Sequence, residues 1–208
     1  NPYFDVFKNQ LFDRGNRFIT NLGLNYDITK WLSVNSRIGA DVFGGFYSVF
    51  YHPESNRAGG NTGGSIDNSN NTNRTITMQN FIQARKSVWK NKLDITARLG
   101  NAMYDFDDNT YSVRGEKLLD PNFNNLNNTD LTTQRQRSTR SRKRVVGFFG
   151  SVDLGYKNWL YATVTGRNDW SSTLPTATNS FFYPSVSGSF IPSEFIKNDK
   201  LKKVLSYV

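Results

Sequence analysis

The 208-residue sequence contains no cysteine and a single histidine, His52. Without cysteine the chain forms no disulfide and has no thiolate nucleophile. One histidine cannot build a multi-histidine zinc site, and Ser171 and Ser172 lack the neighbouring base that a serine nucleophile needs. No run of about 20 apolar residues is present, which excludes a transmembrane helix. These absences argue against catalysis, and we expect a protein that is not an enzyme.

The sequence has instead a two-residue alternation of apolar and polar side chains, the spacing at which alternate residues share one face of a strand. Residues 17–26 and 32–42 show this alternation on either side of a turn at Asp27, and they predict a hairpin with one apolar and one polar face. It recurs at 75–84, 93–100, 146–155, 160–167 and 182–190, although Asn80 and Phe81 each occupy the face of opposite character. Each segment has about ten residues, enough for a tilted strand to cross a bilayer.

The connections between these strands alternate between short and long. Short connections fall near residues 27–30, 86–92 and 156–159, and long ones cover about 43–73, 105–143 and 170–180. Outer-membrane β-barrels have this asymmetry, with short periplasmic turns and long extracellular loops. Soluble β-sandwiches also alternate, but they rarely carry structureless loops of about thirty residues. The loops are rich in Asn, Gly, Ser and Thr, which suits an exposed surface.

Aromatic residues mark the short turns. Trp31, Trp89 and Trp159 each lie at one of them, and Tyr26 and Tyr156 end the strands beside them. Amphipathic rings settle at the headgroup level of a membrane, so these five residues predict an aromatic girdle at one interface. The sequence therefore predicts an all-β fold, part of a large antiparallel transmembrane β-barrel integral to the outer membrane of a Gram-negative bacterium. The alternative is that these rings pack the core of a soluble protein.

Specific motifs then connect the chain with a known family. A Tyr-x-x-Trp-Leu turn occupies Tyr156–Leu160, Arg-x-Asp-x-Ser-Ser occupies Arg167–Ser172, aromatic-Pro-Ser occupies Tyr183–Ser185, and Ser-Glu occupies Ser193–Glu194. In this order they resemble the barrel region of SusC/RagA-type TonB-dependent transporters, and residues 1–42 fit the same pattern. Trp170 departs from it, because the family usually has a small residue at that position.

The resemblance implies about seven strands, with an eighth starting near Leu201, of a 22-stranded barrel. Residues 1–208 are then a single segment of the transmembrane β-barrel domain, and the plug domain and the closing strands lie outside this chain. The start at Asn1-Pro2-Tyr3, without Met, fits a processed or internal fragment. The resemblance also implies nutrient import energised by TonB through the plug, a SusD-like surface lipoprotein as partner, and oligosaccharides, or peptides for some members, as substrates.

The chain is basic, with a formal net charge of +9, which by itself suggests nucleic acid as a partner. Much of the excess falls in one run, formed by Arg135, Arg137, Arg140, Arg142, Lys143 and Arg144. We interpret this run as a solvated loop or strand end that contacts outer-membrane lipid and anionic lipopolysaccharide, and we expect no nucleic-acid binding.

Aromatic rings and amide or carboxylate groups at the extracellular strand ends are the groups that would meet a glycan. By position the ligand-binding candidates are Tyr47, Tyr51, Asn168, Asp169 and Trp170. The alternative is that each only braces neighbouring loops. On the polar face, charged residues predict ion pairs with one another or with the plug; they are Arg37, Arg98, Arg167, Asp41, Asp94 and Asp153.

One acidic segment matches part of a calcium-binding template. Asp105, Asp107, Asn109 and Glu116 fall at positions 1, 3, 5 and 12 of an EF-hand loop. Position 6 is Thr110 instead of the glycine that the sharp turn needs, so we favour a solvated acidic loop with no metal or other cofactor, and keep Ca²⁺ as the alternative.

Two functions from other classes stay open. A non-transporting outer-membrane barrel, such as an adhesin or an assembly component, would lack a plug and a TonB box upstream. A soluble all-β binding module would not partition into detergent or show heat-modifiable migration on a gel.

Overall fold

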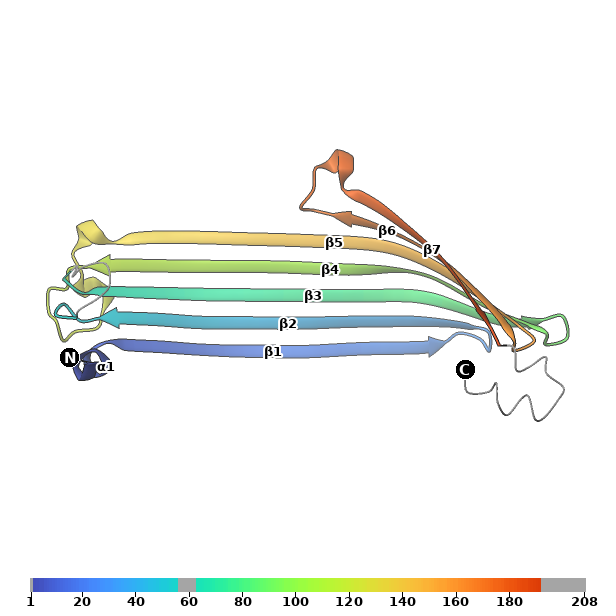
Figure 1. Ribbon diagram of the computed structural model, residues 1–208, viewed down its shortest axis with the longest axis horizontal. Helices are drawn as coiled ribbons and strands as arrows, with labels where there is room; N and C mark the ends of the chain where they lie inside the picture. Colours follow the sequence, from blue (N-terminus) through green and yellow to red (C-terminus); the bar gives the residue numbers. More distant parts are fainter. Residues whose placement is uncertain (1, 56–62, 192–208) are drawn as a thin grey trace. The chain divides into compact units, whose positions relative to one another are not determined.

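The computed structural model of this chain describes residues 2–55 and 63–191. Seven strands form one antiparallel sheet in which each strand pairs with its neighbours in sequence (Figure 1). The strands are β1 (Gln10–Asp27), β2 (Leu32–Tyr51), β3 (Ser65–Val88), β4 (Leu93–Glu116), β5 (Arg135–Tyr156), β6 (Leu160–Ser171) and β7 (Ser180–Phe190). A short helix, α1 (Pro2–Lys8), precedes them, and the 3-10 turns η1 (Leu126–Asn128), η2 (Leu131–Thr133) and η3 (Thr176–Thr178) lie in connections. Each of the seven alternating segments predicted as a strand lies within one of these strands.

Within the described ranges, no helix has the length and apolar character of a membrane span. The expected eighth strand near Leu201 and the Ser193–Glu194 turn lie outside the described residues. So do Gly59, Gly60, Asn61 and Thr62 of the glycine-rich connection.

The central strands are much longer than the alternation predicted. β2, β3, β4 and β5 have 20, 24, 24 and 22 residues. The long connections are therefore shorter than predicted and cover residues 52–64, 117–134 and 172–179. The predicted extents of the first two, 43–73 and 105–143, were wrong. Beyond the predicted segments β3, β4 and β5 are largely polar on both faces, whereas residues 43–51 of β2 have large apolar side chains on both faces, so no alternation of polarity marks these extensions. Cross-strand hydrogen bonds of polar side chains hold them together, such as Ser48 to Asn68 at 2.7 Å.

The short turns fall where they were predicted, at residues 28–31, 89–92 and 157–159. In the last of them Lys157 and Asn158 have φ values of 49° and 63°, and the Trp159 amide donates to the Tyr156 carbonyl at 3.1 Å. Two successive left-handed residues define a type I′ turn, whose twist matches that of the two strands it joins. This turn sets the register of β5 and β6, in which Tyr156 faces Leu160 and Gly147 faces Asp169.

The contacts divide the chain into two compact units. Unit 1 comprises residues 1–20, 40–75 and 106–142, and unit 2 comprises 21–39, 76–105 and 143–208. Strands β1 to β5 contribute to both units, whereas β6 and β7 belong to unit 2. The tight turns all lie in unit 2.

Unit 1 contains the most deeply buried side chains. Phe50 and Ile66 are 3% and 1% exposed. The segment after α1 is fixed to the β2–β3 connection, because the Asn9 side chain donates to Ser55 Oγ at 2.7 Å and accepts from the His52 amide at 3.0 Å. Figure 1 shows α1 at the same end of the strands as this connection. Unit 1 therefore ends in a packed cluster of connections.

Candidate functional site

The two faces of unit 2 differ in chemistry. One face exposes aliphatic side chains from all seven described strands, namely Leu22, Leu24, Ile38, Ile82, Leu99, Val152, Val164 and Val186. A soluble protein does not expose a contiguous apolar surface of this kind, whereas a membrane barrel directs it to lipid. The opposite, polar face is then the one that lines the interior of a barrel, and we consider it the candidate functional surface.

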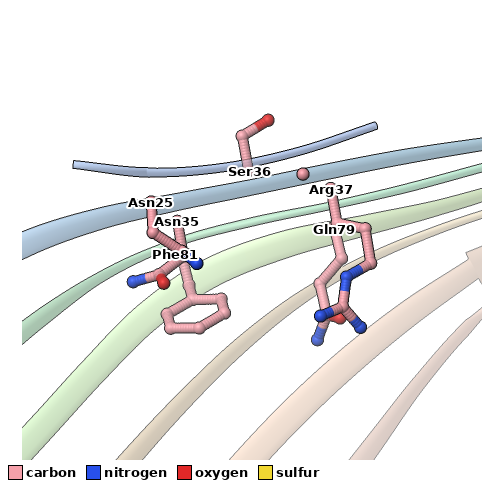
Figure 2. Close-up of a pocket in the computed structure, with 7 residues that line it drawn as sticks. Asn25, Asn35, Ser36, Arg37, Gln79 and Phe81 are labelled. Carbon is pink, nitrogen blue, oxygen red and sulfur yellow. The ribbon is translucent and has the colours of Figure 1, made fainter. Parts of the chain in front are cut away.

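The polar face contains a hollow of about 130 Å³. It is lined by Gly23, Asn25, Asn35, Ser36, Arg37, Gln79 and Phe81. Figure 2 shows the side chains of Asn25, Asn35, Arg37, Gln79 and Phe81 projecting to one side of the sheet, while the Ser36 hydroxyl points to the other. Three amides and one guanidinium offer donors and acceptors beside one aromatic ring. Such a surface suits a ligand rich in hydroxyl or amide groups.

Beside this hollow, hydrogen bonds join side chains of four strands. Arg98 on β4 donates to Asp153 on β5 at 2.6 Å and to Gln83 on β3 at 2.7 Å. Thr163 on β6 donates to the other oxygen of Asp153 at 2.8 Å. Because each strand contributes one polar group, the polar face is rigid at this level. The Arg98–Asp153 ion pair is one of the kind expected among the charged residues of the polar face.

The other predicted charged groups find different partners. Arg17 pairs with Asp41 in unit 1, and Ser87 donates to Asp94 in unit 2. Arg167 pairs with Asp169, two residues further along β6, at 2.8 Å. Arg37 lines the hollow. The charged residues of the polar face therefore form several local pairs.

Glycines allow the larger polar-face side chains to lie flat against the sheet. A methyl group on Gly147 would lie 2.0 Å from Asp169 Oδ1, and one on Gly100 would lie 2.8 Å from the Phe149 ring. Phe149 contacts Phe81 with ring centroids 6.4 Å apart. In the sequence Phe81 interrupts a row of polar residues. In the structure its ring contacts the Phe149 ring, and the two side chains meet over Gly100.

Asn80 was the second residue that interrupted the alternation, and it lies on the apolar face. The Ser36 hydroxyl donates to the side-chain oxygen Oδ1 of Asn80 at 2.7 Å, and the side-chain Nδ2 of Asn80 donates to Asn101 Oδ1 at 3.1 Å. Each of these three polar groups therefore has a partner on a neighbouring strand. Internal pairing of this kind is required where a surface meets lipid.

The structure separates the candidates predicted on β6. Asp169 pairs with Arg167 above Gly147, on the polar face. Asn168 instead donates to Ser180 on β7 at 2.9 Å, and the Trp170 ring packs edge-on against Phe148 with centroids 6.0 Å apart. Successive residues of a strand point to opposite faces, so Asn168 and Trp170 lie on the face that carries Val152 and Val164. A ligand inside the barrel would meet Asp169 alone among these three.

Tyr47 and Tyr51 lie on β2 in unit 1, where Tyr47 is well exposed and Tyr51 ends the strand. Their role in ligand binding stays a prediction. Sequence reasoning missed the hollow around Arg37, since Asn25, Asn35 and Gln79 look like ordinary polar strand residues until β1, β2 and β3 are placed side by side.

The five residues of the predicted girdle lie at or beside the three tight turns of unit 2. Trp31 and Trp89 are exposed, at 54% and 69%. Trp159 packs edge-on against Tyr156 and against Phe190, with centroids 5.6 and 5.7 Å apart. Lys157 lies over the Tyr156 ring at 5.1 Å. Their contact with membrane headgroups stays a prediction.

The calcium template falls on a strand, so the acidic loop expected there was wrong. Asp105 pairs with Arg144, Asp107 with Arg140, and Glu116 with Arg114. Alternation places Glu116 on the opposite face of β4 from Asp105 and Asp107. No group of three acidic or histidine side chains that could hold a metal occurs within residues 2–55 and 63–191.

The only histidine of the sequence, His52, is buried and packs against other residues of unit 1. Its ring is buried, packs edge-on against Phe4 with centroids 5.3 Å apart, and accepts a hydrogen bond from the Glu54 amide at 3.2 Å.

The long β4–β5 connection, residues 117–134, is held in shape by its own hydrogen bonds. Asn128 donates to the carbonyls of Asp120 and Phe123, each at 2.7 Å, and accepts from the Asp120 amide.

Comparison with known proteins gives both a sequence and a structural relationship. No family model matches the chain. A TonB-dependent receptor from Formosa agariphila is 35% identical over 80 residues, which is 38% of this chain and 8% of that receptor. The RagAB peptide transporter matches 95% of this chain and 22% of its own, with 19% identity and a TM-score of 0.83. The RagAB peptide importer in the 'closed-closed' state gives 18% identity and a TM-score of 0.85, with the same coverage.

The chain thus spans less than a tenth of the curated relative and about a fifth of the solved chains that it matches. In fold the chain resembles a segment of the RagAB peptide transporter, and its sequence is similar in part to a TonB-dependent receptor, in agreement with the resemblance that the sequence motifs gave. The predicted location in the outer membrane of a Gram-negative bacterium agrees with both relationships.

Proposed function

We propose that this chain forms part of the wall and of the extracellular loops of a TonB-dependent importer. The observation that supports this best is the two-faced sheet of unit 2. One face exposes aliphatic side chains, and the other holds the hollow around Arg37 and the hydrogen-bonded groups around Arg98. A barrel wall between lipid and an aqueous interior needs this division. A receptor and a peptide transporter among the similar proteins support transport in preference to catalysis.

The cargo we propose is a hydrogen-bonding polymer, either an oligosaccharide or a peptide. The amides of Asn25, Asn35 and Gln79 can donate to and accept from sugar hydroxyls or peptide groups alike. Arg37 adds a charged donor suited to a carboxylate, and Phe81 adds a ring. The same set of groups serves both cargo classes.

The resemblance to SusC/RagA-type transporters supports two further parts of the proposal. TonB would energise import through a plug domain outside this segment. A SusD-like surface lipoprotein would cover the extracellular loops. For unit 1 this means that the braced β4–β5 connection offers such a partner a surface of fixed shape.

The test is uptake by cells that produce the full-length protein. Labelled oligosaccharides and peptides are supplied separately, with TonB present or deleted. The double variant Arg37→Ala with Gln79→Ala removes two ligand-facing groups, and we expect about thirtyfold lower uptake of the true cargo, because each charged or amide hydrogen bond contributes roughly 1 kcal/mol. Lys90→Ala, in the exposed turn at 89–92, is the control that removes a positive charge elsewhere and should leave uptake unchanged.

Two results would contradict the proposal. Uptake that is the same with and without TonB would contradict the proposal that TonB energises import. If neither cargo class enters while the protein still migrates as a folded, heat-modifiable barrel, a non-transporting barrel becomes the better explanation. Co-purification of a surface lipoprotein with the full-length protein tests the partner separately.

A further inference from the structure

The first part of β5 has a neighbouring strand on one side only. β5 begins at Arg135, but its pairing with β6 starts at Val145, which faces Ser171 at the end of β6. Figure 1 shows β4 and β5 side by side over the earlier stretch. On the side away from β4, no strand in the described part of the chain pairs with residues 135–141. We call these residues the β5 edge.

The backbone of the β5 edge directs hydrogen-bonding groups away from β4 at alternate residues. Further along β5, the Arg144 carbonyl accepts from the Ser172 amide and the Arg144 amide donates to Ser172 Oγ, each at 2.8 Å. Alternate residues of an antiparallel strand direct their backbone groups to the same side, so those of Gln136, Ser138 and Arg140 also point away from β4. None of these amides and carbonyls has a partner on that side among the described residues, and all three residues are exposed.

One face of the β5 edge is basic. Arg135 and Arg137 are two residues apart and therefore share a face. Both are exposed, and neither forms an ion pair or a side-chain hydrogen bond within the residues that the structure describes. The sequence from 131 to 152 contains no Asp or Glu, so β5 supplies no carboxylate of its own along this edge.

The acidic residues of β4 do not neutralise these two arginines. Arg98 on β4 bonds to Asp153 on β5, so by alternation Asp108 and Glu116 of β4 lie on the same face as the two arginines. Glu116 pairs with its own neighbour Arg114 at 2.8 Å. Within the described ranges, no ion pair joins Asp108 to either arginine of the β5 edge. Both guanidinium groups therefore remain available to an acidic group from outside.

The chemistry of the β5 edge defines the chain segment that fits it. An extended segment that adds beside a sheet edge satisfies its backbone groups, and its alternate side chains face those of the edge strand. A second copy of this edge would place arginine against arginine, which is unfavourable. On the opposite face Arg140 already pairs with Asp107. The complementary segment therefore has acidic side chains at every second position and uncharged ones between them.

We propose that the β5 edge docks an extended acidic segment of a partner protein, which adds to the sheet as a further strand. This rests on the proposed function only for the extracellular location of this end of β5, and it does not depend on transport. A partner segment fits better than cargo, because a row of backbone hydrogen bonds gives slow dissociation, whereas cargo has to leave its site.

The test measures binding of short labelled peptides to the full-length protein in detergent, by fluorescence anisotropy. One peptide alternates Glu with Thr, a second has the same sequence with N-methyl groups on alternate backbone amides, and a third has Gln in place of Glu. We expect the first to bind, the N-methylated peptides in both alternation registers to bind unequally, with the weaker at least about tenfold below the first, and the Gln peptide to bind about fivefold more weakly.

Charge-matched double variants then locate the site. Arg135→Gln with Arg137→Gln should weaken binding of the Glu peptide about fivefold, because two cross-strand charge pairs are lost. Lys30→Gln with Lys90→Gln removes two charges from the tight turns and should change binding less than about twofold. Heat-modifiable migration confirms that each variant is folded.

Four results would overturn the proposal. They are no saturable binding of the Glu peptide at millimolar concentration, undiminished binding of both N-methylated peptides, equal losses in the two double variants, and TonB-dependent uptake of the Glu peptide by cells, which would make it cargo. Uptake of labelled oligosaccharides and peptides by the same variants is measured in parallel. Lost docking with normal uptake, or the reverse, then separates this proposal from that of transport.

Discussion

We predict that Gly100→Ala destabilises the folded barrel, because the neighbouring strand leaves no space for a methyl group. An ideal Cβ at this position would lie 2.3 Å from the Asn80 carbonyl oxygen, 2.6 Å from Phe81 Cβ and 2.8 Å from Phe149 Cζ. The nearest of these atoms belongs to the backbone of β3, which cannot rotate away as a side chain would. Relief therefore requires β3 and β4 to separate locally.

The magnitude follows from two contributions. Forcing extra volume into a packed contact costs about 1–3 kcal/mol. Moving Phe149 also weakens its contact with Phe81, at 6.4 Å between centroids, which contributes about 0.5–1.5 kcal/mol. We expect the free energy of unfolding to fall by roughly 2–4 kcal/mol in total.

The assay is urea unfolding of the full-length protein in detergent micelles, followed by tryptophan fluorescence and by loss of heat-modifiable migration. Gly150→Ala is the matched control on β5, because its Cβ would meet its nearest neighbour, the Arg98 carbonyl, at an ordinary 3.7 Å. We expect that control to be neutral, or more stable by about 0.4–1 kcal/mol through the stiffer unfolded chain. The reasoning is refuted if Gly100→Ala unfolds at the wild-type urea concentration, or if both variants lose the same stability.

Three further outcomes are expected. Asn128→Ala should speed proteolytic cleavage within residues 117–134 about tenfold, since it removes three hydrogen bonds that brace the connection; Asn127→Ala, whose side chain has no such role, should not. Asp153→Asn and Arg98→Gln should each lower the urea midpoint, and a double-mutant cycle should give a coupling of about 0.2–1 kcal/mol for this half-exposed pair; a coupling of zero would contradict the assigned ion pair. Because the Arg140 hydrogen bond lowers the pKa of Asp107, its stabilisation is present above the unfolded pKa, near 3.8, and is lost as pH falls through the lower folded value. The difference in unfolding midpoint between wild type and Asp107→Asn should thus stay constant from pH 8 to about 5 and shrink only below about 4, and a change near neutral pH would contradict this assignment.

The sequence was most informative where a strand has one apolar and one polar face. Residues 32–42 and 146–155 lie in such segments, and both their strands and the turns beside them were predicted correctly. The extensions of β3 and β4 were not, because residues 65–74 and 105–116 are polar on both faces. Period-two reasoning depends on a contrast between the faces, and here that contrast is absent.

The candidate site was only partly predictable for a related reason. Arg98 and Asp153 lie 55 residues apart, and their pairing could be expected from the shared polar face but not from spacing. Phe81 and Asn80 were noticed only as exceptions to the pattern. In the structure Phe81 packs against Phe149 and lines the hollow, while Asn80 pairs with Ser36 and Asn101. A residue that breaks the alternation therefore indicates a specific cross-strand partner.

Trp170 illustrates a distinction that adjacency in the sequence conceals. Its place beside Asn168 and Asp169 suggested a ligand-binding group, but residues adjacent in a strand diverge. The ring packs on Phe148, and the carboxylate of Asp169 pairs with Arg167 on the other side of the sheet. Strand parity, applied to this motif, would have separated the three residues.

The order of the strands has a consequence for biogenesis. Within residues 2–55 and 63–191 each strand pairs with strands adjacent to it in the chain, so none of these strands has to wait for a distant one of them to be synthesised. Assembly can proceed by adding one hairpin at a time to a growing edge, so that only the first and the newest strand of the open sheet expose unpaired amides. A strand deleted from the middle would then shift every later hairpin to the wrong neighbour. A change confined to residues 117–134 would leave the order of addition intact, so loop sequences can diverge without interrupting assembly.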